Sequence, residues 1–143
     1  MAIVRPCKTL NASMPGSVRI LTVLSVRKAI QRFPRRGYNS LKAQILAAAE
    51  SIPFNIVEGA GADSRKEFAR FLDISVRSSF ELEYQLLLAR DYKLLPEALW
   101  ASLTNETIEI RRMICAFRCR LREADAAERR NRTKKSKPSV TTH

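Results

Sequence analysis

Apolar residues recur at helical spacing along most of the chain, and no segment alternates polar and apolar residues for long. Steps of three and four residues between apolar positions are typical of amphipathic helices. These steps extend over residues 20–33, 41–61, 65–92 and 96–121, and proline, glycine or a polar turn separates each range from the next. The pattern therefore predicts an all-α protein built from four helices.

Residues suited to helix ends mark the same boundaries. Ser17 and Ser40 can cap the first and second helices, and Ser64 can form a capping box with Glu67 at the third. Pro53 lies inside the second helix, where it lacks a backbone donor and crowds the preceding turn, so we expect a bend or a brief break there. The glycines of "EGAGADS" end that helix in a short corner, which favours antiparallel packing of the second and third helices.

The same pattern divides the chain into one domain and two ends. Residues 16–127 form the predicted bundle domain, and a chain of 143 residues is long enough for a single core. Residues 1–15 contain two prolines and no helical period, which predicts a loose N-terminal extension. Residues 128–143, "ERRNRTKKSKPSVTTH", are too polar and charged to pack, so we expect a basic tail with little fixed structure.

The third helix carries more apolar surface than one partner helix can cover. One stripe runs from Phe68 to Ala89, and a second stripe includes Phe80, Tyr84 and Leu87. Apolar stripes on a helix are normally buried in the core or against another molecule. We therefore expect the surplus to be covered either by the rest of the bundle or by another subunit.

Positive charge is concentrated in two parts of the chain. The formal net charge is +12. Residues 1–49 hold nine Lys or Arg and no acid, residues 50–128 hold eleven bases and all fourteen acids, and residues 129–143 add six bases without an acid. A polyanion would therefore bind at the first helical segment and at the tail. A membrane surface, an acidic protein, or simple solvation of the protein are the alternative explanations of this charge.

We predict that basic residues bind RNA or DNA phosphates without reading bases. These residues lie on the first helix, in the turn after it, on the outer face of the fourth helix and in the tail. Tyr38 and Trp100 are the main candidates for base stacking, which is too few to indicate sequence-specific recognition of single strands. The predicted nucleic-acid-binding residues are Arg19, Arg27, Lys28, Arg32, Arg35, Arg36, Lys42, Arg111, Arg118, Arg122, Arg129, Arg130, Arg132, Lys134, Lys135 and Lys137.

Few residues are suited to catalysis. The only histidine is His143, so the usual general base and the Ser-His or Cys-His pairs are missing. Cys115 and Cys119 lie one helical turn apart without a further metal ligand nearby, and we expect free thiols in a reducing cytosol. The sequence therefore predicts a cytoplasmic, non-enzymatic protein without cofactor or metal. An organellar transit peptide is the alternative reading of the acid-free N-terminus.

Charged residues also fall within the apolar pattern of the second and third helices. Glu58, Arg70, Glu81 and Glu83 are the members of this group. Paired carboxylates can perform acid-base chemistry, but an arginine in the same region favours a structural network of ion pairs and hydrogen bonds. We interpret these residues as part of the fold.

Two stretches, "SIPFNIVEG" and "KEFARFLDISVRSSFELEYQLLLA", resemble the four-helix-bundle family encoded by intervening sequences in bacterial large-subunit ribosomal RNA genes. That family is similar to the accessory variability proteins of diversity-generating retroelements. The resemblance covers residues 17–121, although the first helix lacks the usual aromatic and acidic residues and the basic tail is not part of the common pattern. The matching positions are Ser51, Ile52, Pro53, Asn55, Ile56, Glu58 and Gly59, then Glu67, Phe68, Arg70, Phe71 and Leu72, and then Ser78 to Ala89, which includes Glu81.

The resemblance implies an antiparallel up-down-up-down four-helix bundle, assembly into a homopentameric barrel, and no catalytic activity. The matching residues would serve the bundle and its interfaces. In the retroelement branch the resemblance implies a basic barrel that binds nucleic acid and assists a reverse transcriptase. Because the chain is strongly basic, we expect this role. A ribosome- or rRNA-associated role and a protein-interaction module are the alternatives.

Overall fold

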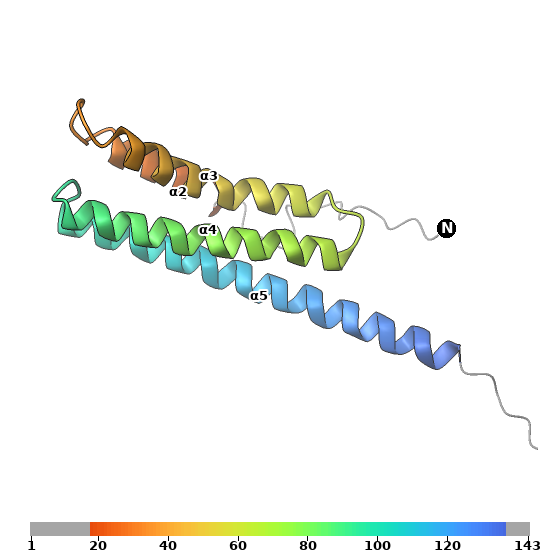
Figure 1. Cartoon of the computed structure of the whole chain (residues 1–143). Helices are drawn as coiled ribbons and strands as arrows, with labels where there is room; N and C mark the ends of the chain where they lie inside the picture. Colours follow the sequence, from red (N-terminus) through yellow and green to blue (C-terminus); the bar gives the residue numbers. More distant parts are fainter. Residues whose placement is uncertain (1–17, 137–143) are drawn as a thin grey trace, which may run out of the picture.

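A computed structural model describes residues 18–136, which form four helices and no strand. The helices are α2 (Val18–Ile30), α3 (Asn39–Ala60), α4 (Arg65–Asp91) and α5 (Glu97–Lys135). Successive helices run in opposite directions and are joined by short loops (Figure 1). The predicted all-α class and the four-helix bundle are confirmed. The predicted extension, residues 1–15, lies outside the described residues.

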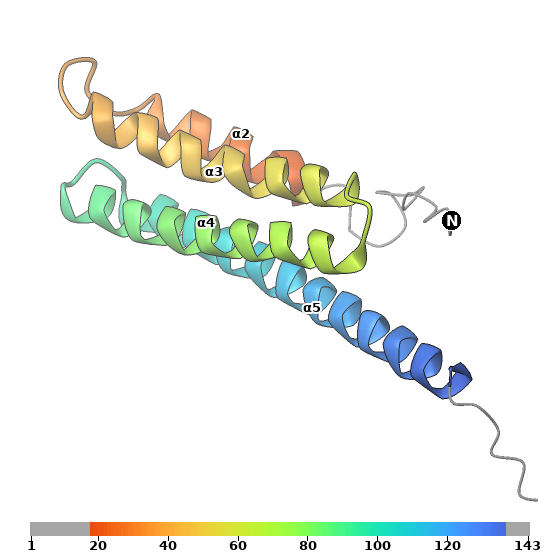
Figure 2. The same cartoon turned by 45° about the vertical axis from the view of Figure 1, so that its right-hand side comes forward.

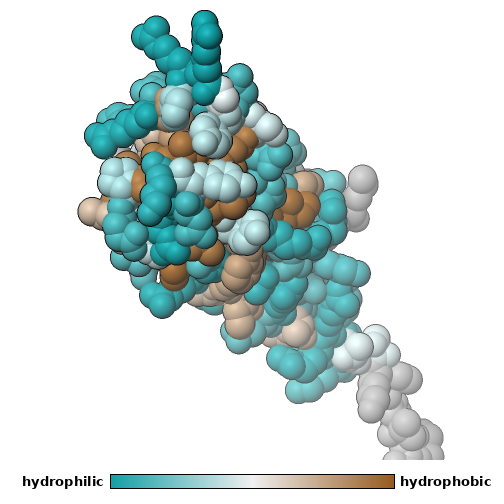
Figure 3. Space-filling model, turned by 60° about the vertical axis from the view of Figure 1, so that its left-hand side comes forward, coloured by the Kyte–Doolittle hydropathy of each residue, from teal (hydrophilic) through white to brown (hydrophobic). Residues whose placement is uncertain are grey.

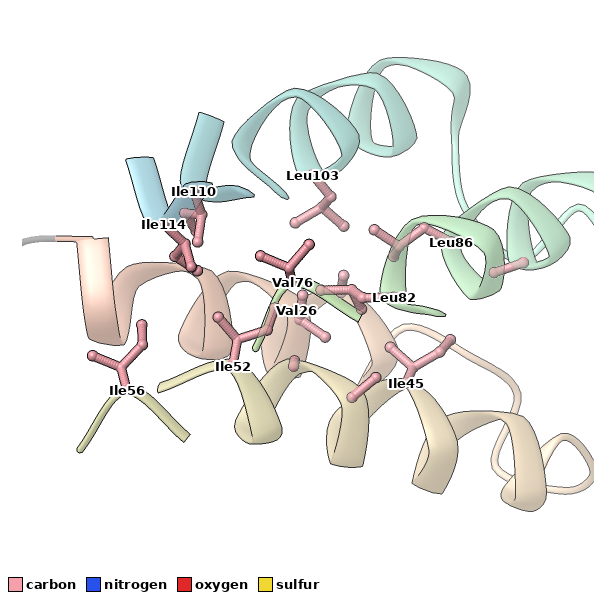
Figure 4. Packing of buried hydrophobic residues seen from close by; sticks show 14 of the residues in the cluster. Val26, Ile45, Ile52, Ile56, Val76, Leu82, Leu86, Leu103, Ile110 and Ile114 are labelled. Atoms are coloured by element: carbon pink, nitrogen blue, oxygen red, sulfur yellow. The ribbon is translucent and has the colours of Figure 1, made fainter. Parts of the chain in front are cut away.

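The core lies between all four helices, and α4 makes the most extensive contacts. It packs against α3 on one side and α5 on the other, whereas α2 makes smaller contacts with α3 and α5. Apolar side chains from every helix meet in one cluster (Figure 4). Each fully buried aliphatic side chain contributes about 1.5–3 kcal/mol to folding. The first predicted stripe of α4 is confirmed as core, since its buried members include Leu72, Ser75, Ser79, Leu82, Leu86 and Ala89.

The second stripe of α4 is only partly covered by the described residues, since Leu87 is half-buried but the two aromatic members are exposed. Phe80 is 56% exposed and Tyr84 is 66% exposed. On the neighbouring helix α3, Phe54 and Val57 are 63% and 53% exposed. The surplus apolar surface that the sequence predicts is therefore real, and the described residues of one chain do not cover it.

Of the three predicted serine caps, Ser17 lies outside the described residues, and the other two behave differently. Ser64 has an extended backbone and its hydroxyl accepts a hydrogen bond from the Glu67 backbone N–H at 3.1 Å, so the predicted cap of α4 is confirmed. The Glu67 carboxylate accepts from the Arg70 guanidinium at 2.6 Å, and the reciprocal half of the predicted capping box is not found among the described residues.

Helix α3 instead begins at Asn39, after Tyr38 in a left-handed conformation, and no side chain caps it. The Ser40 hydroxyl lies inside the helix and accepts from the Gln44 side chain. The predicted cap at Ser40 is therefore wrong.

Substituting these two serines tests the difference between them. The Ser64→Ala variant is expected to lose about 1 kcal/mol of unfolding free energy, because a backbone donor at the start of α4 loses its acceptor. The matched Ser40→Ala variant removes a hydroxyl that caps nothing, so we expect a change within about 0.5 kcal/mol. Urea unfolding followed by circular dichroism measures both. Equal losses would contradict this assignment.

Helix α3 continues unbroken through Pro53, so the predicted brief break is not found. The turn around the proline is instead tied together by side chains. The Asn55 amide donates to the Ser51 carbonyl oxygen at 2.8 Å and to the Ser51 hydroxyl at 3.0 Å. That hydroxyl lies 2.8 Å from the Ser78 hydroxyl, and Ser75 donates to the Ile52 carbonyl oxygen at 2.8 Å. These bonds hold the proline-containing turn against α4.

Helix α5 is longer than the sequence pattern predicts and projects past the end of α4 (Figure 2). The prediction of a tail without fixed structure is wrong for residues 128–135, which are helical. Good helix formers and ion pairs one turn apart support this extension, namely Arg129 with Asp125 and Arg132 with Glu128. Basic residues in the last turn also interact favourably with the helix dipole.

Candidate nucleic-acid interface

The fold separates the predicted basic residues into two surfaces at opposite ends of the bundle. The loop between α2 and α3 lies at the same end as the loop between α4 and α5, whereas the last turns of α5 extend beyond the other end (Figure 1). Helix α4 spans the distance between the two ends with 27 residues. At 1.5 Å per residue this separation is about 40 Å.

We call the first of these the loop-end surface. Its side chains are exposed, and none of them forms an ion pair with a residue of the described range. Figure 3 views the molecule from this side and shows hydrophilic side chains projecting around smaller hydrophobic patches. Lys42 lies beside this surface and donates to the Pro34 carbonyl oxygen at 2.9 Å. The loop-end surface consists of Arg27, Lys28, Arg32, Arg35, Arg36 and Lys93.

Two exposed tyrosines come together on the loop-end surface. The ring centroids of Tyr38 and Tyr92 are 6.1 Å apart, and the rings are tilted by 41°. Tyr38 was a candidate from the sequence, but Tyr92 was missed, because only the fold brings these two loops together. Trp100, the other predicted stacking residue, is half-buried, and the Arg90 guanidinium lies 4.2 Å from its ring centroid. Trp100 is therefore not an exposed stacking platform.

We call the second surface the arm, which consists of residues 129–135 of α5. Its basic side chains are all exposed. The ion pairs of Arg129 and Arg132 join residues one turn apart on the same helix, and such exposed pairs contribute little, on the order of 0.5 kcal/mol or less. Phosphate groups can therefore replace these carboxylates at little cost.

A hollow of about 440 Å³ lies where the arm leaves α4. Arg65 on α4 reaches across to Glu128 at 2.6 Å. Cations and carboxylates both face this hollow, so its charge is mixed, unlike that of the arm itself. The lining includes Arg65, Lys66, Arg70, Arg122 and Arg129 together with Glu67, Asp73 and Asp125.

The predicted arginines in the middle of α5 contact residues of α4. Arg111 is 2.6 Å from Glu83 and its guanidinium stacks 3.9 Å from the Phe80 ring centroid. Arg118 and Arg122 both bind Asp73, at 2.8 and 2.7 Å. The side chains of Arg111 and Arg118 are only 14% and 25% exposed. The prediction that they lie on the outer face of the helix is therefore wrong, and their charges are used within the bundle.

The predicted network of buried charges is also only partly correct. Glu58, Arg70 and Glu81 are exposed, so they do not lie in apolar surroundings. Arg70 pairs with Glu67 at 2.6 Å, and this hydrogen bond lowers the pKa of the Glu67 carboxyl. Of these four residues, Glu83 alone forms a largely buried ion pair within the described range, and its partner is Arg111 rather than Arg70.

Other chemistries find little support in the residues that the structure describes. Cys115 is half-buried and Cys119 is exposed, and both are free thiols. No group of three His, Cys, Asp or Glu that could hold a metal ion occurs between residues 18 and 136. Within the same range, no helix combines the length and the apolar character that crossing a bilayer requires. The remaining predicted residues, the Arg19 side chain and Lys137, lie outside the described part of the chain.

The fold and its two surfaces define a basic, antiparallel four-helix bundle with cationic ends. The model of the 23S rRNA-intervening sequence protein family matches residues 20–116, and the chain belongs to this family. The resemblance to the rRNA-linked family is confirmed.

The fold is shared by solved structures. One of them is a protein of unknown function from the S23 ribosomal protein family of Bacteroides thetaiotaomicron, with 23% sequence identity and a TM-score of 0.64. The alignment covers 71% of this chain and 94% of that one. No curated protein matches the chain. The matched family model is named for an intervening sequence of 23S rRNA, so the rRNA-linked alternative is better supported than the retroelement role.

Proposed function

We propose that the protein is a non-enzymatic scaffold that binds RNA through phosphate contacts. The observation that carries this proposal is the presence, at both ends of the bundle, of exposed cations that have no ion-pair partner among the described residues. The loop-end surface has no ion-paired member, and Arg130, Lys134 and Lys135 of the arm are likewise exposed without an ion pair inside residues 22–136. The name of the matched family links it to ribosomal RNA genes, which favours RNA as the polyanion.

The proposed scaffold is an oligomer located in the cytoplasm. The exposed apolar side chains of Phe54 and Val57 on α3 give a second copy a surface to cover. The free thiols of Cys115 and Cys119 are in keeping with a reducing compartment. Assembly as a pentamer stays a prediction, as does a reverse transcriptase partner, for which neither match offers support.

Salt titration of RNA binding tests the proposed function. With about six phosphate contacts, the affinity for a labelled RNA is expected to fall on the order of a thousandfold between 50 and 200 mM salt. Fluorescence anisotropy measures this slope. A protein that only contacts acidic proteins would bind no RNA at low salt, and that outcome would remove the proposal.

Truncation after Glu128 provides the matched variant. The ion pairs of residues 129–135 that the structure describes are made to the preceding turn of α5, so the bundle core is left intact. We expect weaker RNA binding, a shallower salt slope and an unchanged oligomeric state by light scattering. Loss of assembly on truncation would contradict the separation of the arm from the core.

A further inference from the structure

We propose that the loop-end surface binds unpaired nucleotides, with bases stacked on Tyr38 and Tyr92 and phosphates held by the neighbouring cations. This inference rests on the proposed RNA binding and identifies which part of an RNA this surface takes. The arm presents cations without exposed aromatic rings, so it would bind the phosphates of paired and unpaired RNA alike.

The tyrosine pair has the geometry of an accessible platform. Tyr38 is 43% exposed and Tyr92 is 50% exposed, although their ring centroids are only 6.1 Å apart. The rings are tilted by 41°, so neither covers the other completely. Aromatic faces open to solvent are the feature on which single-stranded nucleic acids stack, largely without regard to sequence.

The backbone turns sharply beside each of the two rings. Among the described residues, Tyr38 and Lys93 are the non-glycine residues with positive φ, at 57° and 62°. One lies in each loop, and Lys93 directly follows Tyr92. At Lys93 this is the αL residue of a Schellman helix end, because the Leu94 N–H bonds the Ala89 carbonyl oxygen and the Lys93 N–H bonds the Arg90 carbonyl oxygen, both at 2.9 Å. Tyr38 directly precedes the first residue of α3. The end of α4 and the start of α3 are therefore both sharp corners, and the two tyrosines meet where these corners lie side by side.

The charges around the pair favour an anion. Arg36 and Lys93 lie within two residues of the tyrosines and are exposed without an ion pair in the described range. The nearby carboxylates of Asp91 and Glu97 are both engaged by Arg90, at 3.1 and 3.8 Å. The local cations are therefore free to bind phosphates.

The combination of exposed tyrosine rings and nearby cations favours unpaired over paired RNA. In a duplex the bases are stacked on one another and their faces cannot reach a protein ring. Unpaired bases in loops, bulges and ends can be splayed onto aromatic side chains while cations hold the backbone. Stacking on the two tyrosines therefore adds binding free energy for single strands but not for a duplex.

The test compares single-stranded and duplex RNA of equal length on the full chain. Tyr38→Leu and Tyr92→Leu are each expected to lower the affinity for the single strand about tenfold, with duplex binding changed less than twofold. Tyr38→Phe and Tyr92→Phe keep the ring and should bind within about twofold of the parent. Tyr84→Leu is the matched control, since Tyr84 is also exposed in one chain but lies on the second stripe of α4. With the parent's oligomeric state verified by light scattering, it should change neither affinity.

The outcomes separate this inference from the proposed function. If the parent protein binds RNA but the leucine variants bind single strands normally, or lose single strands and duplexes equally, the stacking site is overturned and RNA binding stands. If the parent binds no RNA, the proposed function itself fails. Photocrosslinking of the parent protein to a 4-thiouridine oligonucleotide checks the site without any substitution. Crosslinks are expected at the two loops, and crosslinks confined to the arm would overturn the inference.

Discussion

Replacing Gly59 by leucine is expected to lower the unfolding free energy by about 3 kcal/mol or more, because α3 and α4 touch at this glycine. A Cβ atom at Gly59 would lie 2.5 Å from the Phe68 ring and 2.9 Å from the Phe71 Cβ. Phe68 is buried and packs edge-on against Phe117, at a centroid distance of 5.3 Å, so its ring has little room to move. The Phe71 Cβ can move only with its backbone. A larger side chain therefore forces the two helices apart.

The nearby Gly61 provides the control for this substitution. A Cβ at Gly61 would meet only the Glu58 carbonyl oxygen at 3.5 Å and the Val57 carbonyl oxygen at 3.9 Å, and its φ of −84° suits any residue. Gly61→Ala is expected to leave stability unchanged or raise it by about 0.4–1 kcal/mol, since alanine restricts the unfolded chain. Chemical denaturation of both variants measures the difference. If Gly59→Leu were as stable as Gly61→Ala, the close helix contact would be refuted.

Much of the fold follows from periodicity and from a few residues at helix ends. The apolar steps on α4 identify its buried face, and Ser64 marks its start, because both features act within one or two turns of a helix. The length of α5 could not be predicted in this way. The stretch "ERRNRTKK" has no apolar face that could pack against the bundle. A helix can nevertheless continue into solvent when its residues are good helix formers and form ion pairs one turn apart.

The candidate site was less predictable, because charge in a sequence does not show where a side chain finds a partner. Arg111 and Arg36 look equally free in the sequence. Arg111 faces Glu83 across the contact between α4 and α5, whereas Arg36 lies in a loop without a carboxylate partner in the described range. Tyr38 and Tyr92 are far apart in the chain, and only the antiparallel order of the helices places their loops at one end.

The ion pair between Glu83 and Arg111 gives the second large effect. Their nearest atoms are 2.6 Å apart, but the alignment does not meet hydrogen-bond geometry, so the contact acts mainly through charge. Replacing Glu83 with glutamine leaves the largely buried Arg111 without a counter-charge. Breaking a fully buried pair costs about 3–5 kcal/mol, and because Glu83 is 32% exposed we expect a smaller loss of about 2 kcal/mol. Thermal and urea unfolding measure it.

A second substitution distinguishes lost pairing from lost packing. In the variant that combines Glu83→Leu with Arg111→Met, no charge remains to be compensated and Phe80 keeps an apolar neighbour, so we expect stability to recover to within about 1 kcal/mol of the parent. The matched control is Glu81→Gln, two residues away and exposed, which should change stability by less than about 0.5 kcal/mol. If the double variant were less stable than Glu83→Gln alone, the ion pair would add net stability to the bundle, beyond the neutralisation of each charge by the other. If Glu81→Gln matched Glu83→Gln, burial of the pair would have no role.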